Sequence, residues 1–163
     1  NFNYLIAELL SQHSTEFNKY IRYKNVFSYR GNLTPQSSPL FFLGGHANLI
    51  GYSNDEFWGR KVVYTQNLFE LKPLPDLKFS VGRMNFRRLS VLFQLDLGRV
   101  SGAPKLLEYR RQTTDVKVGT GFGLGFNTDL PYMPKTDIHF IVARPSETGK
   151  DLKFYAGFGG WVN

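Results

Sequence analysis

Bulky and small residues alternate along the chain from Val116 to Phe126. One set of positions is bulky and mostly apolar: Val116, Val118, Thr120, Phe122, Leu124 and Phe126. The positions between them are Lys117, Gly119, Gly121, Gly123 and Gly125. Because successive side chains of a strand point to opposite faces, this segment is predicted to be a strand with one apolar and one nearly bare face. Such a strand is typical of a sheet whose outer face contacts an apolar environment and whose inner face has another segment packed closely against its backbone.

The glycines of this segment have two other readings. A dinucleotide-binding loop also carries closely spaced glycines, but it needs a tight turn and a helix start after them. The next residues, Asn127 to Pro134, contain two prolines and are predicted to form a turn, so we expect no dinucleotide site. An inner strand of an ordinary soluble β-sandwich or small barrel is the alternative that this pattern leaves open.

The same period of two occurs along most of the chain and predicts an all-β protein. Further strands are expected at Phe2–Leu10, Phe17–Arg30, Trp58–Leu71, Leu77–Val81, Ser90–Val100, Ile138–Ala143 and Leu152–Trp161. A polar turn is expected at Ser11–Thr15. In the Ser90–Val100 strand, Phe93 is predicted to face outward, and Gln94 and Asp96 inward. Seven or eight strands result, joined by short turns and long polar loops, which predicts an antiparallel transmembrane β-barrel.

A long connection runs from Gly31 to Phe57 and is rich in Gly, Pro, Ser and Asn. Loops of this length without structure of their own are uncommon in compact domains and are usually functional. The part from Phe41 to Tyr52 is too apolar for a free surface loop. We therefore expect this connection to fold back and be buried.

Composition narrows the class of protein. Aromatic residues make up 16% of the 163 residues, which favours β structure, and the length suits one domain. Cysteine is absent, so disulfides and thiolate metal sites are excluded. No apolar window is long enough for a transmembrane helix, whereas a transmembrane strand needs only about ten residues of alternating polarity. The net charge of +7 is spread over many segments, which fits a solvated or lumenal face better than nucleic-acid binding.

Four motifs follow one another in a recognisable order. They are Gly44-Gly45 with Leu49-Ile50-Gly51-Tyr52, Glu70-Leu71-Lys72-Pro73-Leu74, Phe93 to Val100 with Asp96 and Gly98, and Gly121-Phe122-Gly123-Leu124-Gly125-Phe126. Their order resembles the C-terminal half of the barrel in the BamA/TamA superfamily, also called the bacterial surface antigen family, which includes the two-partner secretion transporters. The first motif resembles that family's Gly-Gly and Arg-Gly-Phe/Tyr loop. The third resembles its Phe-x-x-Asp-x-Gly-x-Val strand, and the resemblance covers nearly the whole chain.

The resemblance implies that residues 1–163 are the C-terminal portion of an outer-membrane barrel domain, with the loop of residues 31–57 folded into the lumen. The loop motif would then meet inward acidic residues, here Glu70 and Asp96. Ile50 stands where the family carries an arginine, so the usual ion pair is not expected, and the latch is expected to be either weakened or remade with Arg60 or His46. A final aromatic strand carries the assembly signal in such barrels, and its residues here are Phe154, Phe158 and Trp161.

Barrels of this family contain about twice as many strands as this chain offers. An open sheet edge cannot be left in lipid, because its backbone groups would be unpaired. We therefore expect the rest of a longer chain, or further copies in a homo-oligomer, to complete the barrel, unless the chain closes on itself as a small eight-stranded barrel. The expected location is a Gram-negative type of outer membrane. Its lipids and unfolded client proteins are the expected partners, and nucleic acid is not.

Candidate catalytic chemistry is sparse. His13, His46 and His139 fall on three separate elements without an acidic neighbour at metal-ligand spacing, so they are interpreted as structural histidines. No Gly-x-Ser-x-Gly nucleophile motif occurs. We expect no enzyme activity, no metal site and no cofactor.

Three functions are consistent with these patterns. The first is a membrane-embedded part of an assembly or translocation barrel that acts on unfolded proteins. The second is a passive outer-membrane anchor for an attached domain such as a patatin-like lipase, which the loss of the loop arginine favours slightly. The third is a soluble basic β-barrel that binds a lipid or nucleic acid in its cavity.

Overall fold

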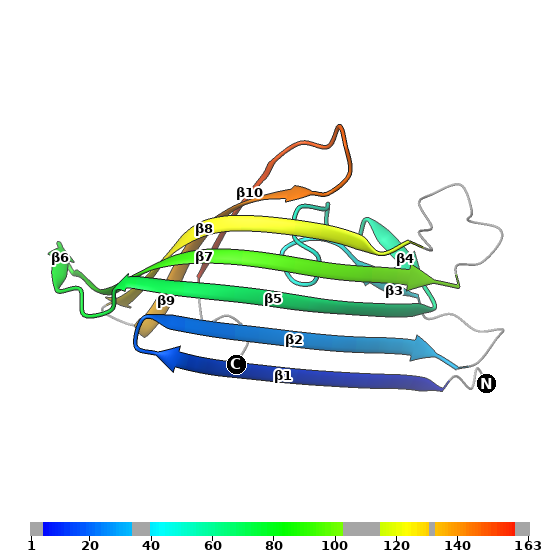
Figure 1. The fold of residues 1–163 in the computed structure, drawn as a ribbon, viewed down its shortest axis with the longest axis horizontal. Helices are drawn as coiled ribbons and strands as arrows, with labels where there is room; N and C mark the ends of the chain where they lie inside the picture. The colour runs from blue at the N-terminus through cyan, green and yellow to red at the C-terminus, as the bar shows by residue number, and fades with distance from the viewer. Residues whose placement is uncertain (1–4, 34–39, 103–114, 131–132, 159–163) are drawn as a thin grey trace.

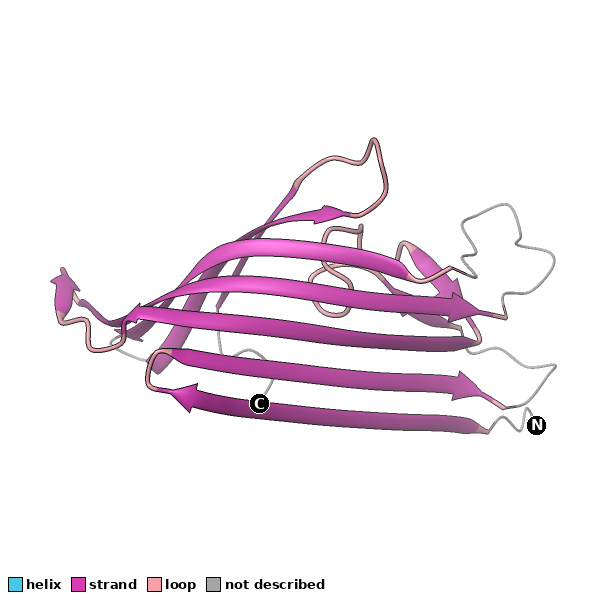
Figure 2. Ribbon diagram, in the orientation of Figure 1, coloured by secondary structure: helices cyan, strands magenta, loops and turns pink. Residues whose placement is uncertain are grey.

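The computed structural model describes residues 5–33, 40–102, 115–130 and 133–158 of the chain. All regular structure in these ranges is β structure (Figure 2). The main strands are β1 (Ile6–Asn18), β2 (Ile21–Asn32), β5 (Lys61–Leu74), β7 (Met84–Ser101), β8 (Lys117–Leu130), β9 (Met133–Pro145) and β10 (Lys153–Phe158). Three short strands are β3 (Phe41–Leu43), β4 (Phe57–Gly59) and β6 (Phe79–Val81). Within the described ranges, no helix is long and apolar enough to cross a membrane.

The main sheet is an antiparallel meander. Its strands follow the order β1-β2-β5-β7-β8-β9-β10, and β6 pairs with β7 beside this path. The sheet curls, so that β9 and β10 turn behind β7 and β8 (Figure 1). An antiparallel all-β fold with seven or eight strands is therefore confirmed. The sheet is not closed, because β1 and β10 lie at opposite edges and do not pair in the part of the chain that the structure describes.

The two ends of the sheet differ in their connections. One end carries the turn between β1 and β2 and the hairpin of β6 with β7, and we call it the short-turn end (left in Figure 1). The opposite end carries the long connection from β2 to β5, and we call it the long-loop end. Within that connection, β3 and β4 form a separate two-stranded sheet that lies behind the main sheet.

Apolar side chains form continuous rows across the outer face of the main sheet. The strand registers place these residues side by side in one row: Tyr23, Phe69, Phe93, Phe122, Val142 and Phe154. The neighbouring row consists of Ile21, Leu71, Val91, Leu124, Phe140 and Ala156. Phe122 is 60% exposed and Phe154 is 67% exposed. The outward orientation predicted for Phe93 and Phe122 is thus confirmed.

The opposite, inner face holds the apolar core. One buried cluster joins four residues of the long connection to two strand residues: Leu43, Leu49, Tyr52 and Phe57, with Val62 and Val100. A second cluster joins Ile50 to Leu68, Leu92, Ile141 and Ala143. Burial is confirmed for part of the apolar segment Phe41 to Tyr52, since Leu43, Leu49 and Ile50 are completely buried.

The predicted boundary between the first two strands is wrong. Ser11–Thr15 is not a turn but lies inside β1, where each of these residues pairs with β2. The predicted strand Phe17–Arg30 is instead interrupted between Asn18 and Ile21. The Asn18 carboxamide oxygen accepts hydrogen bonds from the backbone N–H groups of Tyr20 (2.8 Å) and Ile21 (2.9 Å). Asn favours such turns because its side chain bonds to the backbone nearby, whereas a polar run fits in an edge strand.

Other strand boundaries also shift. Trp58 belongs to β4, and β5 begins only at Lys61. The strand predicted from Ser90 begins earlier, at Met84, because its first part pairs with β6. The last strand is described as far as Phe158, so Trp161 lies outside the described residues.

Candidate functional site

The segment from Phe41 to Gly59, which we call the inserted loop, forms the candidate functional site. Its turn begins at Gly44 and Gly45, which have φ angles of 132° and 93°. These angles favour glycine because a Cβ atom would be strained there. The Gly44 N–H donates to the Asn48 side-chain oxygen at 2.7 Å, and the Leu49 N–H donates to the Gly45 carbonyl at 3.0 Å. The two glycines therefore allow a tight turn that leads the chain back toward the sheet.

A hydrogen bond to Asp96 fixes the tip of the inserted loop. The Ile50 backbone N–H donates to Asp96 Oδ2 at 2.9 Å, and Gln94 Nε2 donates to the same oxygen at 2.8 Å. Asp96 is fully buried on the inner face of β7. The loop therefore meets this carboxyl group through the backbone N–H of Ile50. His46 and Arg60 were expected to take over that contact, but His46 stacks on His139 and Arg60 lies beside Gly102.

Glycines on the inner face make room for the inserted loop. A Cβ atom at Gly119 would collide with the Ile50 carbonyl oxygen, and one at Gly121 would lie 3.1 Å from the Ile50 side chain. A Cβ at Gly98 would lie 2.6 Å from Leu43. Among the other predicted strand glycines, Gly123 lies against the carbonyl of Phe140 and Gly125 near Leu92. The inner face of β8 is thus bare where the loop approaches, as its alternation predicted, but only two of its four glycines contact the loop.

Two tyrosines connect the inserted loop to the last strands. Tyr155 accepts a hydrogen bond from the Gly51 N–H at 3.2 Å and donates one to the Tyr52 carbonyl at 3.1 Å. The Tyr52 hydroxyl donates to the Val118 carbonyl at 3.3 Å. Gly51 has a φ of 89°, and an added Cβ there would lie 2.7 Å from the backbone of β9. The Gly51-Tyr52 motif therefore contacts β8, β9 and β10 together.

Two histidines that are far apart in the sequence meet beside this contact. The rings of His46 and His139 are stacked, with centroids 5.3 Å apart and planes 9° from parallel, and Tyr155 lies 5.4 Å from His46. The sequence places them on separate elements, and the fold brings these two elements into contact. Burial lowers the pKa of His46, so its ring is neutral at neutral pH. Within the described ranges, no group of three His, Cys, Asp or Glu side chains is placed to hold a metal ion.

A charged cluster covers the inserted loop at the long-loop end. Lys150 pairs with Glu56 of the loop and, at 2.9 Å, with Glu147. Lys117 pairs with Glu147 at 2.6 Å. The hydrogen bonds from Lys117 and Lys150 hold the pKa of Glu147 below its ordinary value. Lys150 also lies 4.7 Å from the centroid of the Tyr52 ring, so this cluster, which we call the outer clamp, contacts the loop at Glu56 and Tyr52.

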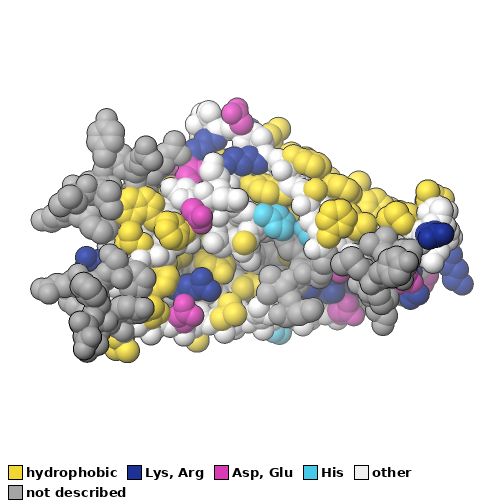
Figure 3. Space-filling view, turned by 180° about the vertical axis from the view of Figure 1, so that it is seen from behind, with side chains coloured by type: hydrophobic (Ala, Val, Ile, Leu, Met, Phe, Trp, Pro, Cys, Tyr) yellow, Lys and Arg dark blue, Asp and Glu magenta, His cyan; other side chains and the backbone are white. Residues whose placement is uncertain are grey.

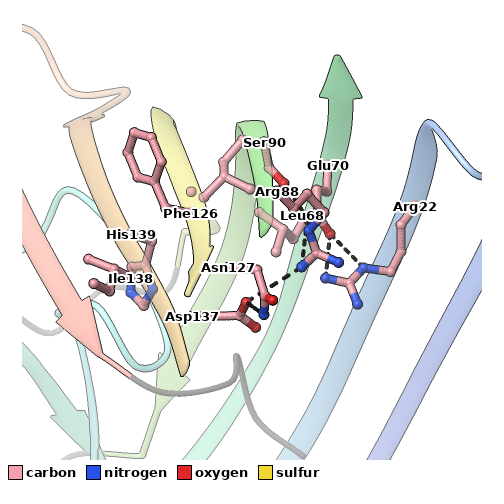
Figure 4. Close-up of a pocket in the computed structure, with 12 residues that line it drawn as sticks. Arg22, Leu68, Glu70, Arg88, Ser90, Phe126, Asn127, Asp137, Ile138 and His139 are labelled. Atoms are coloured by element: carbon pink, nitrogen blue, oxygen red, sulfur yellow. Dashed lines mark hydrogen bonds and ion pairs between the residues drawn. The ribbon is translucent and has the colours of Figure 1, made fainter. Parts of the chain in front are cut away.

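Glu70 belongs to a different part of the inner face (Figure 4). Its carboxylate accepts hydrogen bonds from Arg22 Nε (2.6 Å) and Ser90 Oγ (2.6 Å) and lies 3.5 Å from Arg88. Arg88 also lies 3.5 Å from Asp137, which accepts a hydrogen bond from Asn127 at 2.8 Å. Of the two acidic residues expected to meet the loop, only Asp96 contacts it. Glu70 instead connects β2, β5 and β7 in a polar network toward the short-turn end.

The sequence reasoning missed this polar network. Its members lie at inward positions of consecutive strands and carry opposite charges. This pattern would predict the network if the strand register were known. The register itself depends on pairing between distant segments and is not readable from one strand. Of the predicted assembly-signal residues, Phe154 and Phe158 lie exposed on β10.

No family model matches this chain, and neither a curated protein nor a solved structure matches it significantly. The structure by itself defines the architecture, which is an open and curled antiparallel meander with a loop packed on its inner face.

Proposed function

We propose that this chain is part of an outer-membrane β-barrel of the assembly and translocation class. The observation that carries the proposal is the inserted loop, which is seated on the inner face by Asp96 and by the glycines of β8. A loop fixed inside a barrel by a buried acidic residue is what the resemblance to the bacterial surface antigen family implies.

The outer face supports a membrane location. A contiguous apolar surface that spans two rows of the sheet is rare on a soluble monomer, whereas barrel strands in a membrane present an apolar band to lipid. The inner face at the same depth carries buried polar side chains, Glu70, Gln94 and Asp96, beside its apolar clusters. This combination disfavours a soluble barrel with a ligand cavity, because the chain's own loop occupies the space that such a ligand would need.

The edges support a role as part of a larger barrel. β1 and β10 end the sheet, and unpaired edge strands cost several kcal/mol per backbone group in lipid. Further strands, from a longer chain or from other copies, would pair with these edges. β10 pairs with only part of β9, from Lys153↔Ala143 to Phe158↔Ile138, so its seam is the shortest among the described pairs of main strands.

A passive anchor is the second candidate, and one observation favours it. Ile50 is completely buried and replaces the family's arginine, so the loop is packed as core and offers no charged group to Asp96. An anchor for an attached domain needs only an inserted loop that is stably packed in this way.

Membrane partition tests the location that both candidates share. The chain should stay in the membrane pellet after carbonate washing and run as a heat-modifiable band in detergent. A soluble, monodisperse monomer would refute the membrane location and would support the hypothesis of a soluble β-barrel instead.

Depletion of the protein in its host separates the two candidates. For an assembly barrel, depletion should lower the outer-membrane levels of other β-barrel or secreted proteins. Re-expression of Asp96→Leu should fail to restore them although the variant inserts, whereas Asp151→Leu, at an exposed carboxylate, should restore them. For an anchor, client levels should stay unchanged and only display of the attached domain should be lost.

A further inference from the structure

The hairpin of β6 and the start of β7 has one apolar and one polar face. Cross-strand pairing places Phe79 opposite Phe86 and Val81 opposite Met84, and all four side chains lie on the same face. The alternate positions are polar, and Ser80 donates a hydrogen bond to Asn85 at 2.7 Å there. This hairpin projects at the short-turn end of the sheet (Figure 1).

The apolar face of the hairpin encloses a groove with the outer face of the sheet. The hairpin contributes Leu77 and its four paired apolar residues, and β8 and β9 contribute Phe126, Ile138 and Phe140. The groove has a volume of about 400 Å³, which is within the range of small-molecule sites. Phe126, Ile138 and Phe140 have the same strand parity as the exposed Phe122 and Val142, so the groove is continuous with the apolar outer rows.

The hairpin that forms this groove and the residues next to it are rich in basic side chains. The segment from Asp76 to Arg88 contains four basic residues, Lys78, Arg83, Arg87 and Arg88, and one acidic residue, Asp76. Arg87 pairs with Asp129, and Arg88 turns inward to Glu70. Lys78 and Arg83 are exposed. Figure 3 shows Lys and Arg side chains beside hydrophobic side chains at this end of the molecule (right in that view).

We propose that this groove binds an anionic glycerophospholipid. An acyl chain occupies the apolar groove, and Lys78 and Arg83 bind the phosphate of the headgroup. The inference rests on the proposed membrane location, and the charges argue for this occupant, since clustered Lys and Arg at a membrane boundary attract anionic headgroups. The short-turn end of an outer-membrane barrel faces the periplasm. The leaflet of the outer membrane on that side consists of glycerophospholipids.

Photo-crosslinking in vesicles tests the proposal. The protein is reconstituted in phosphatidylcholine vesicles that contain a trace of either phosphatidylglycerol or phosphatidylcholine with a photoactivatable group in the acyl chain. The peptide from Phe79 to Phe86 should be labelled preferentially by the phosphatidylglycerol probe. Lys78→Gln and Arg83→Gln should each reduce this preference about fivefold, because a basic residue near an anionic headgroup contributes about 1 kcal/mol.

Lys19→Gln is the matched control. Lys19 lies in the turn between β1 and β2, at the same end of the sheet but away from the groove, and its substitution should leave the labelling unchanged. Equal labelling by both probes, or no labelling of this peptide in a protein that gives a heat-modifiable band, would overturn the proposal and leave the membrane location intact. Absence of that band would refute both.

A second copy of the chain is the competing occupant. Because the chain contains no cysteine, Val81→Cys introduces a single thiol into the groove. A disulfide-linked dimer of this variant in the vesicles would assign the groove to contact between copies and overturn lipid binding. A monomer that still shows the phosphatidylglycerol preference would support it.

Discussion

Gly119 and Gly125 lie on the same face of β8 but have different surroundings. A Cβ atom at Gly119 would overlap the carbonyl oxygen of Ile50, whereas one at Gly125 would lie 3.4 Å from Leu92, an ordinary contact. The loop backbone can approach β8 only because Gly119 has no side chain. At the scale of single residues, the seat of the inserted loop is therefore defined by missing atoms as well as by hydrogen bonds.

Gly119→Ala should displace the inserted loop. Overpacking of this kind costs about 1 to 3 kcal/mol, so the variant should unfold at lower urea concentration and its loop should be cut faster by protease. Gly125→Ala is the matched control, and it should be neutral or slightly stabilising because Ala restricts the unfolded chain. Equal effects of the two variants would show that the loop does not sit on Gly119.

Asp96 should contribute to loop seating as a hydrogen-bond acceptor. Asp96→Leu leaves the buried Ile50 N–H without its acceptor, which costs about 1 to 3 kcal/mol. Asp96→Asn keeps an acceptor oxygen and should cost less. The two free energies of unfolding can be compared by urea titration, and an Asn variant as unstable as the Leu variant would show that an acceptor oxygen alone does not replace the carboxyl group.

At the scale of elements, the inserted loop shows which features the sequence predicts and which it does not. The apolar run from Phe41 to Tyr52 predicts burial because such a segment is unfavourable in water. Its contacts on the inner face were not readable, since Ile50 and Asp96 lie 46 residues apart. The hairpin turn at Asn18 was missed because the apolar alternation continues on both sides of it.

The outer clamp should open in acid. Because Lys117 and Lys150 lower the pKa of Glu147 in the folded state, its contribution to stability is fully present above the unfolded pKa and is lost as pH falls through the folded pKa. Hydrogen exchange of the Tyr52 and Phe57 amides should therefore accelerate, after correction for intrinsic rates, below the ordinary range of a Glu carboxyl.

Glu147→Gln is the control for this pH dependence. The variant should exchange faster than the wild type at neutral pH and should respond less to acid, because the titrating carboxyl is absent. An unchanged acid response would assign the opening to another group.

At the scale of the whole molecule, the main sheet has an outer face of exposed apolar rows and an inner face on which the inserted loop packs. Substitutions on the outer face should show whether it contacts lipid or water. Phe93 lies within the aromatic row, whereas Val63 lies on the same outer face opposite Arg99, nearer the long-loop end. In a bilayer, a lysine at the midplane of a barrel costs about 2 to 4 kcal/mol and one near the interface about 0 to 1 kcal/mol.

Phe93→Lys should therefore destabilise the protein more than Val63→Lys when both are unfolded by urea from lipid vesicles. The physical reason is the depth of the introduced charge. Similar small effects of the two substitutions would indicate that the outer face contacts water, contrary to the proposed membrane location.

The sequence alone determined which residues face which side of the strands with a clear alternation, such as those that contain Phe93 and Phe122. The period of two is a local property, and it correctly placed Phe93 and Phe122 outward and Asp96 and Gly119 inward. The apolar content of the long connection likewise determined its burial. Both predictions follow from the side-chain pattern of one short segment.

Only the tertiary structure decided how the segments meet. It brought Ile50 to Asp96, His46 to His139 and Arg22 to Glu70, and it left the sheet open between β1 and β10. Each of these outcomes depends on strand register and curvature, which arise from many weak contacts between distant parts of the chain. No single segment contains that information, because its own alternation is equally compatible with several partners.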